Sequence, residues 1–171
     1  MEIVIYNFHE NRQLAYLKML ECQSIIDENL QCNGGTLRQD DLLLQPYNWQ
    51  HLLVAQVDKV PIGFSLIRKS PEDKHNTGYS EYNYLSVIAV KRQAQHMGVG
   101  TELLNQSLLL STDIPLVASC RKDNKASKKF LSNQMTSYEN TRRYYRFLDN
   151  KSYKEKYGIK HNYSKWIRKF R

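Results

Sequence analysis

A glycine-containing loop between two apolar runs is the part of this chain best suited to chemistry. The first run spans Tyr84–Val90. The second consists of leucines at helical spacing, Leu103, Leu104 and Leu108. This order predicts a strand, a loop and a helix. Because the first N–H groups of a helix have no intrahelical partners and lie at its positive dipole end, the junction favours binding of an anion, above all a phosphate.

The two glycines of the loop, Gly98 and Gly100, have no Cβ atom that would keep a ligand away from the backbone, and they can adopt positive φ. A plain left-handed turn explains the glycines equally well. Two well-known nucleotide loops do not fit. Thr101 follows without the lysine of a Walker A loop, and Leu103 occupies the third glycine position of a Rossmann loop.

The wider pattern around this loop is more specific. The segment Ile88-Ala89-Val90, the loop 95–100 and the helix starting near Leu103 resemble the acyl-CoA motif of the GCN5-related N-acetyltransferases. In that family Leu-Ala-Val is followed by Arg/Gln-x-x-Gly-x-Gly/Ala and an amphipathic helix. The next predicted strand, 114–120, and the helix start 124–131 also resemble the family, in which Asn-x-x-Ala/Ser opens a helix. The resemblance covers residues 81–133 well and the remainder loosely.

The resemblance implies an α/β (α+β) fold in which a mixed, mostly antiparallel central sheet is flanked by helices. It also implies an N-acetyltransferase that uses acetyl-CoA as co-substrate and passes the acetyl group to an amine by direct attack. Pantetheine would pair with the strand and the pyrophosphate with the loop amides. The residues implied in cofactor binding are Ile88, Ala89, Val90, Gln95, His96, Met97, Gly98, Val99, Gly100, Thr101, Asn124 and Ser127.

The catalytic residues are less well matched. Family members often place a glutamate on the central strand as base and a tyrosine in the following helix as acid, but those positions hold Tyr84 and Leu131. Glu81 is then the candidate base, and Tyr145, or its neighbour Tyr144, the candidate acid. The departures leave open a different reading, in which the chain is a non-catalytic acyl-CoA-binding regulatory module.

Other elements are expected on both sides of this motif. Strands are predicted over 2–6, 51–57, 61–67 and 81–90, the last three forming a meander. Leucines at helical intervals predict one or two helices within 9–26. After residue 133, the segment 138–148 suits a helix or a strand. Two further strands are expected over 151–158 and 163–170, with Trp166 and Ile167 as core anchors.

The length of 171 residues favours a single domain spanning 1–171. The cysteines, Cys22, Cys32 and Cys120, are odd in number and widely spaced, and no histidine pair has the spacing of metal ligands. The N-terminus lacks a signal-peptide pattern, and no apolar run approaches the ~20 residues of a membrane span. These features predict a cytoplasmic protein with reduced thiols, no metal and no membrane association.

Charge is distributed unevenly along the chain. Residues 1–120 hold 9 Lys and Arg against 13 Asp and Glu, whereas residues 121–171 hold 16 against 4. Such asymmetry suggests an anionic partner for the C-terminal third, for example RNA or a ribosomal particle carrying the acceptor. A solvated basic surface, or nucleic-acid binding without CoA, would also account for the charge. A dimer is compatible with the sequence.

Overall fold

The computed structural model describes residues 2–9, 11–29, 31–32, 35–36, 49–70, 82–112, 114, 116–121, 124–137 and 163–167. The chain divides into two units. The first comprises Met1–Lys69 with Leu85–Leu110, and the second Ser70–Tyr84 with Ser111–Arg171. None of the helices in the described part of the chain has the length and apolar character needed to cross a lipid bilayer.

The first unit is built on a sheet with the strand order β1-β4-β5-β6. These strands are β1 (Val4–Asn7), β4 (Trp49–Val57), β5 (Val60–Ser70) and β6 (Tyr82–Val90), of which the last begins in the second unit. The pairs β1–β4 and β4–β5 are antiparallel. The three strands predicted to follow one another in a meander, β4, β5 and β6, are neighbours in the sheet in that order, and the β4–β5 hairpin is confirmed. Its turn passes through Asp58 and Lys59, both with positive φ as a tight hairpin turn requires.

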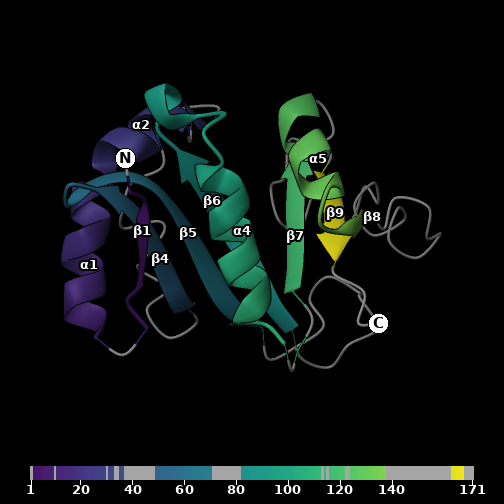
Figure 1. The fold of residues 1–171 in the computed structure, drawn as a ribbon. Helices are drawn as coiled ribbons and strands as arrows, with labels where there is room; N and C mark the ends of the chain where they lie inside the picture. Colours follow the sequence, from purple (N-terminus) through teal and green to yellow (C-terminus); the bar gives the residue numbers. More distant parts are fainter. Residues whose placement is uncertain are drawn as a thin grey trace. The chain divides into compact units, whose positions relative to one another are not determined.

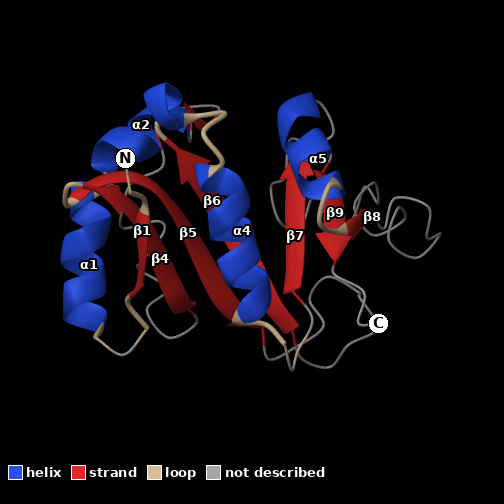
Figure 2. Cartoon of the chain, viewed as in Figure 1, coloured by secondary structure: helices blue, strands red, loops and turns tan. Residues whose placement is uncertain are grey.

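Helices cover both faces of this sheet (Figure 1, Figure 2). On one face, α1 (Arg12–Glu21) and α2 (Gln23–Asn29) share a core cluster with apolar residues of β4, β5 and β6. On the other face, α4 (Val99–Leu109) packs through Val99 and Leu103. A small hairpin of β2 (Gln31–Cys32) and β3 (Gly35–Thr36) follows α2.

Two helices form where one or two were predicted, but the leucine stripe of α1 does not face the core. Leu14, Leu17 and Leu20 are exposed by 40%, 49% and 38%, whereas Ala15, Met19 and Cys22 are fully buried. Both sets recur at helical spacing, so α1 carries two apolar stripes. The buried stripe packs in the core cluster with apolar residues of the sheet.

The second unit contains the strand order β7-β9-β8 and one described helix. Its elements are β7 (Leu116–Arg121), α5 (Lys125–Ser132), β8 (Thr136–Ser137) and β9 (Tyr163–Ile167). β9 is antiparallel to β7 and to β8. The strands predicted over 114–120 and 163–170 are thus confirmed with shifted ends. The segments 138–148 and 151–158 lie outside the described residues.

Candidate active site

The predicted cofactor loop joins the end of β6 to the start of α4. It begins with a short 3-10 turn, η1 (Arg92–Ala94), in which the N–H of Ala94 donates to Lys91 O at 2.9 Å and the N–H of Gln95 to Arg92 O at 3.2 Å. The amide of Gln95 was among those predicted to bind the cofactor. Because it is already paired within the turn, the available amides begin at His96.

The next residues of the loop include two with a left-handed backbone. His96 has a φ of +64° and Gly98 a φ of +83°, so two residues of the turn are left-handed. A residue such as His96 in this region costs on the order of 1–2 kcal/mol relative to a right-handed conformation. Gly100 lies inside α4 and has no positive φ, so only Gly98 needs the conformational freedom of glycine.

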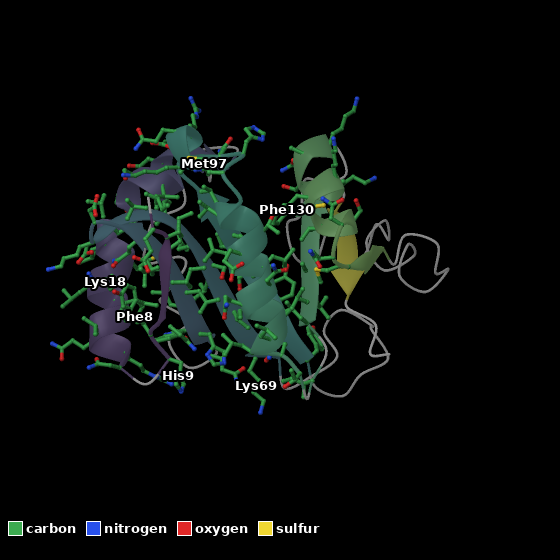
Figure 3. The ribbon with its side chains drawn as sticks, in the orientation of Figure 1. Phe8, His9, Lys18, Lys69, Met97 and Phe130 are labelled. Atoms are coloured by element: carbon green, nitrogen blue, oxygen red, sulfur yellow. The ribbon has the colours of Figure 1, made fainter. Side chains whose placement is uncertain are left out.

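The start of α4 provides a series of unpaired donors. Gly98 is the N-cap and makes no side-chain capping bond, and the first turn closes when the N–H of Glu102 donates to Gly98 O at 2.9 Å. Within the described residues, none of the N–H groups of residues 96–101 has a hydrogen-bond acceptor. Figure 3 shows Met97 of this loop at one end of the first unit, with His9 and Lys69 at the other.

The dipole of α4 favours an anion at the start of the helix, and the one acidic side chain in the first turn is turned toward the helix. The one acidic residue in the first turn of α4 is Glu102, whose Oε1 accepts a hydrogen bond from Gln106 Nε2 at 3.0 Å, one turn further along the helix. The carboxylate is therefore held toward Gln106. The positive end of the helix dipole remains unneutralised by a side-chain cap.

The helix that carries these donors is firmly seated. Val99, Leu103 and Leu104 are essentially fully buried, as predicted for its leucines. A Cβ added at Gly98 would meet no atom of the described residues within 4 Å, so this side of the loop is open among them. Free donors, a dipole and an open side together fit the pyrophosphate of a coenzyme A thioester.

The end of β6 is only partly available to a ligand. Ala89 is buried against α1 and α2, while Ile88 and Val90 are half-buried on the α4 side. The carbonyl oxygen of Val90 accepts two hydrogen bonds, from Asn29 Nδ2 at 3.1 Å and from Gln95 Nε2 at 3.2 Å. Both of its lone pairs are occupied, so this carbonyl is not free for the pairing with pantetheine that the sequence predicted.

The predicted residues of the second unit have a visible local role. The side chain of Asn124 caps α5 by accepting a hydrogen bond from the N–H of Ser127 at 3.0 Å. Leu131, at the family's tyrosine position, is buried. Tyr84, at the glutamate position, packs against a cluster formed by Tyr82 and Val117. Glu81, Tyr144 and Tyr145 lie outside the described residues.

Sequence reasoning missed the contribution of α2 to this loop. Besides the bond from Asn29, the carboxylate of Glu28 accepts a hydrogen bond from the N–H of Arg92 at 2.9 Å. An asparagine at a helix end is a recognisable stop signal. The partner of its side chain, 61 positions later, leaves no such signal in the sequence.

Comparison with known proteins agrees with this geometry. The model of the acetyltransferase (GNAT) family matches residues 20–135, about two thirds of the chain. Among curated protein sequences, no significant match is found. Solved structures similar over nearly the whole chain include a chain of the NatC complex bound to Gag peptide and CoA, at 14% identity, 100% coverage of both chains and a TM-score of 0.61.

Two structures from Thermoplasma species are similar as well. Ard1 from Thermoplasma volcanium has 16% identity, covers 98% of this chain and 97% of its own, and gives a TM-score of 0.61. PaiA N-acetyltransferase from Thermoplasma acidophilum, in complex with coenzyme A, has 13% identity, covers 99% and 100%, and gives 0.57. These similarities confirm the predicted fold class, a mixed sheet flanked by helices. The chain belongs to the GNAT family of acetyltransferases and is an acetyl-CoA-dependent N-acetyltransferase.

Proposed function

We propose that the main-chain amides of residues 96–101 bind the pyrophosphate of acetyl-CoA, and that the enzyme delivers the acetyl group to a primary amine. The observation that carries this proposal is the series of donors at the start of α4, which have no acceptor within the described residues. Main-chain donors at a helix start are a common binding site for phosphate groups. The open side at Gly98 supports the same conclusion.

Bound acetyl-CoA supplies a thioester that an amine can attack. The contribution of the chain is mainly to hold the two reactants in line, which is worth roughly 7–11 kcal/mol at best. In this proposal the main chain of Ile88 holds the extended pantetheine arm, and an N–H group at the end of β6 donates to the acyl carbonyl oxygen as it gains negative charge. The carbonyl of Val90 takes no part, because Asn29 and Gln95 already bind it.

Two side chains are proposed to handle protons. Glu81 accepts the proton that the amine loses, and Tyr145 donates a proton to the departing thiolate. Glu81→Gln and Tyr145→Phe are each expected to lower kcat and to remove one limb of its pH profile, while the Kd for CoA stays unchanged. If both variants keep the wild-type kcat and pH profile, other groups carry the protons.

The acceptor is best identified by a direct assay. Release of free thiol from acetyl-CoA is measured against peptides with free N-termini, free lysine, aminoglycosides and aminoacyl-tRNA. Peptides take the first place because the similar NatC structure was solved with a peptide and CoA bound. Turnover on one class identifies the acceptor. Tight CoA binding without turnover on any amine would instead favour a regulatory acyl-CoA-binding module.

Substitution of Gly98 tests the cofactor site itself. Asparagine tolerates positive φ, so Gly98→Asn keeps the turn but places a side chain on the open side of the loop. We expect the Kd for CoA, measured by calorimetry, to rise at least about tenfold, with little change in melting temperature without ligand. The control is Leu109→Ala at the exposed far end of α4. Unchanged affinity in Gly98→Asn would place the pyrophosphate elsewhere.

Ligand-induced stabilisation gives a second test. A ligand at a hundred times its Kd stabilises a protein by about 2.7 kcal/mol, which is easily seen as a rise in melting temperature. Wild-type protein that gains no stability from CoA or acetyl-CoA would refute the proposed cofactor site. A nucleic-acid-binding protein without CoA would behave in that way.

The basic C-terminal third motivates an RNA-borne acceptor. Residues 121–171 hold 16 Lys and Arg against 4 Asp and Glu. If these cations contact phosphates, affinity for tRNA falls steeply as the salt concentration rises. A fluorescence titration of the full chain with tRNA at two salt concentrations measures this slope. Weak binding at both concentrations would indicate a solvated basic surface.

A further inference from the structure

The last turn of α2 is attached to the cofactor loop by polar side chains. Asn29, the final residue of α2, uses both hydrogens of its amide, one on Ile25 O of its own helix at 2.9 Å and one on Val90 O at 3.1 Å. Its Oδ1 accepts a hydrogen bond from Gln95 Nε2 at 3.3 Å. Gln95 Nε2 also donates to Val90 O at 3.2 Å. The two side-chain amides and this carbonyl therefore form a closed, mutually satisfied set.

A second attachment lies next to the first. Glu28, the neighbour of Asn29, accepts a hydrogen bond from the N–H of Arg92 at 2.9 Å. Glu28 and Asn29 together hold the turn before His96 at three positions. These are residue 90 at its start, residue 92 in its middle and residue 95 at its end. α2 itself is anchored, since Ile25 and Ile26 are fully buried. The attachment thus connects the loop to a fixed point in the core.

The loop needs such an attachment because of its conformation. His96 and Gly98 both have positive φ, and such backbone persists only where its surroundings determine it. In the described residues, the N–H groups that follow make no bond of their own that would hold them in place. Their direction is set by the turn on one side and by the buried residues of α4, such as Val99, on the other.

We propose that Asn29 is a positioning residue of the acetyltransferase, which holds the turn between β6 and α4 in the conformation that presents its amides to CoA. The inference rests on the proposed cofactor site. Asn29 acts through Val90 and Gln95 and does not contact the cofactor. Its amide geometry is specific: alanine removes all its bonds, and aspartate would place a carboxylate against the carbonyl of Val90.

The test compares Asn29→Ala with a matched control. Asn11 caps the start of α1 in the same unit, where its Oδ1 accepts a hydrogen bond from the N–H of Leu14 at 2.9 Å. Asn11→Ala and Asn29→Ala each remove an asparagine side chain that bonds to a helix end. We expect the Kd for CoA, measured by calorimetry, to rise at least about tenfold in Asn29→Ala and to stay at the wild-type value in Asn11→Ala. Hydrogen exchange at the main-chain amides of Arg92, Ala94 and Gln95, which are hydrogen-bonded in the turn, is expected to accelerate only in Asn29→Ala.

A double-mutant cycle checks that the effect passes through Gln95. If the two side-chain amides act as one set, Asn29→Ala with Gln95→Ala binds CoA about as well as the weaker single variant, rather than losing the product of both effects. Glu28→Gln provides a milder variant should Asn29→Ala fail to fold, and it is expected to weaken CoA binding in the same direction.

The outcomes separate this inference from the proposed function. Wild-type protein that does not bind CoA refutes the cofactor site and the inference with it. Wild-type protein that binds CoA, together with an unchanged Kd in Asn29→Ala, refutes the positioning role alone. Equal loss of affinity in Asn11→Ala and Asn29→Ala would also refute it. The loss would then result from lower stability of the protein and not from a displaced cofactor loop.

Discussion

Gly63 on β5 lies beneath Val99, the first residue of α4: a Cβ at residue 63 would lie 3.1 Å from Val99 Cγ1. The same Cβ would lie 3.1 Å from the main-chain oxygen of Ala89 on β6 and 3.2 Å from Leu103 Cδ1. The absence of a side chain at this one position lets the helix that bears the cofactor amides rest directly on the sheet.

Gly63→Ala is expected to lower the free energy of unfolding by about 1–3 kcal/mol, because the added methyl overpacks a buried contact that includes main-chain atoms. Urea denaturation measures this change. Adding Val99→Ala removes one of the crowded atoms, so the double variant should lose less than the sum of the two single losses. Wild-type stability of Gly63→Ala would show that α4 shifts without cost.

The left-handed conformation of His96 predicts opposite effects of two substitutions. His96→Gly relieves the backbone strain and is expected to raise the free energy of unfolding by up to about 1 kcal/mol, after the entropy cost of glycine. His96→Val is expected to lower it by about 1–2 kcal/mol, since a β-branched residue tolerates positive φ poorly. Chemical denaturation gives both values, and Met97→Val, at the exposed neighbouring position, is the control. Equal stability of the two His96 variants would contradict the prediction.

A histidine pair in the first unit predicts acid sensitivity. The rings of His9 and His51 lie 5.3 Å apart, and His51 Nδ1 is within 3.1 Å of Asn7 Nδ2 and 3.3 Å of Asn7 Oδ1. Burial, and secondly the charge of His9, lowers the pKa of His51 below its usual value. The stability from neutral His51 is complete above the unfolded pKa of ~6.5. As the pH falls below it, the unfolded chain gains a proton that the folded chain does not, so stability declines toward the folded pKa.

His51→Gln is therefore expected to flatten the fall in unfolding free energy between about pH 7.5 and pH 5.5. Denaturation curves of the wild type and the variant at both pH values isolate this contribution from that of the carboxylates. His9→Gln removes only the secondary cause and should flatten the decline less. A variant His51→Gln that loses as much stability in acid as the wild type would show that His51 does not titrate in this way.

The thiol of Cys22 is predicted to be unreactive toward alkylating reagents in the folded protein. It is fully buried at the junction of α1 and α2, and burial, with a smaller effect of Glu21, raises the pKa of its thiol to about 12, against the opposing charges of Lys18 and Lys91. Since only the thiolate reacts, alkylation at mildly alkaline pH should be slower by orders of magnitude than for a free cysteine of pKa ~8.5. Mass spectrometry after iodoacetamide treatment, with and without urea, measures this. Rapid labelling of native Cys22 would require a local opening of the helix junction.

Local patterns in the sequence were enough to predict much of the first unit and the loop. Apolar runs and a short polar turn defined the hairpin and the central strand, and the leucines of α4 are buried as expected. The capped start of α5 was readable because Asn124 and its partner Ser127 are three residues apart. Signals of this kind depend on neighbours in the chain, and they need no knowledge of the tertiary fold.

Relationships between distant residues were not predictable in the same way. Asn29 and Gln95 are polar residues 66 positions apart, and no periodicity connects them. Hydrophobicity also could not predict which face of α1 is buried, because the stripe with Leu17 and the stripe with Met19 both have helical spacing. Only the fit against the sheet selects between them.

One buried polar contact favours a single orientation of α4 about its own axis. Ser65 Oγ on β5 lies 3.1 Å from Ser107 Oγ on α4, and Ser107 also donates to Leu103 O at 2.8 Å. A leucine-rich helix can bury its apolar side chains in several rotational orientations about its own axis, because hydrophobic contacts are not directional. Two fully buried hydroxyl groups can hydrogen-bond to each other in only one of these orientations. Residues buried within the unit, and not only those of the loop, therefore contribute to the direction in which the loop amides point.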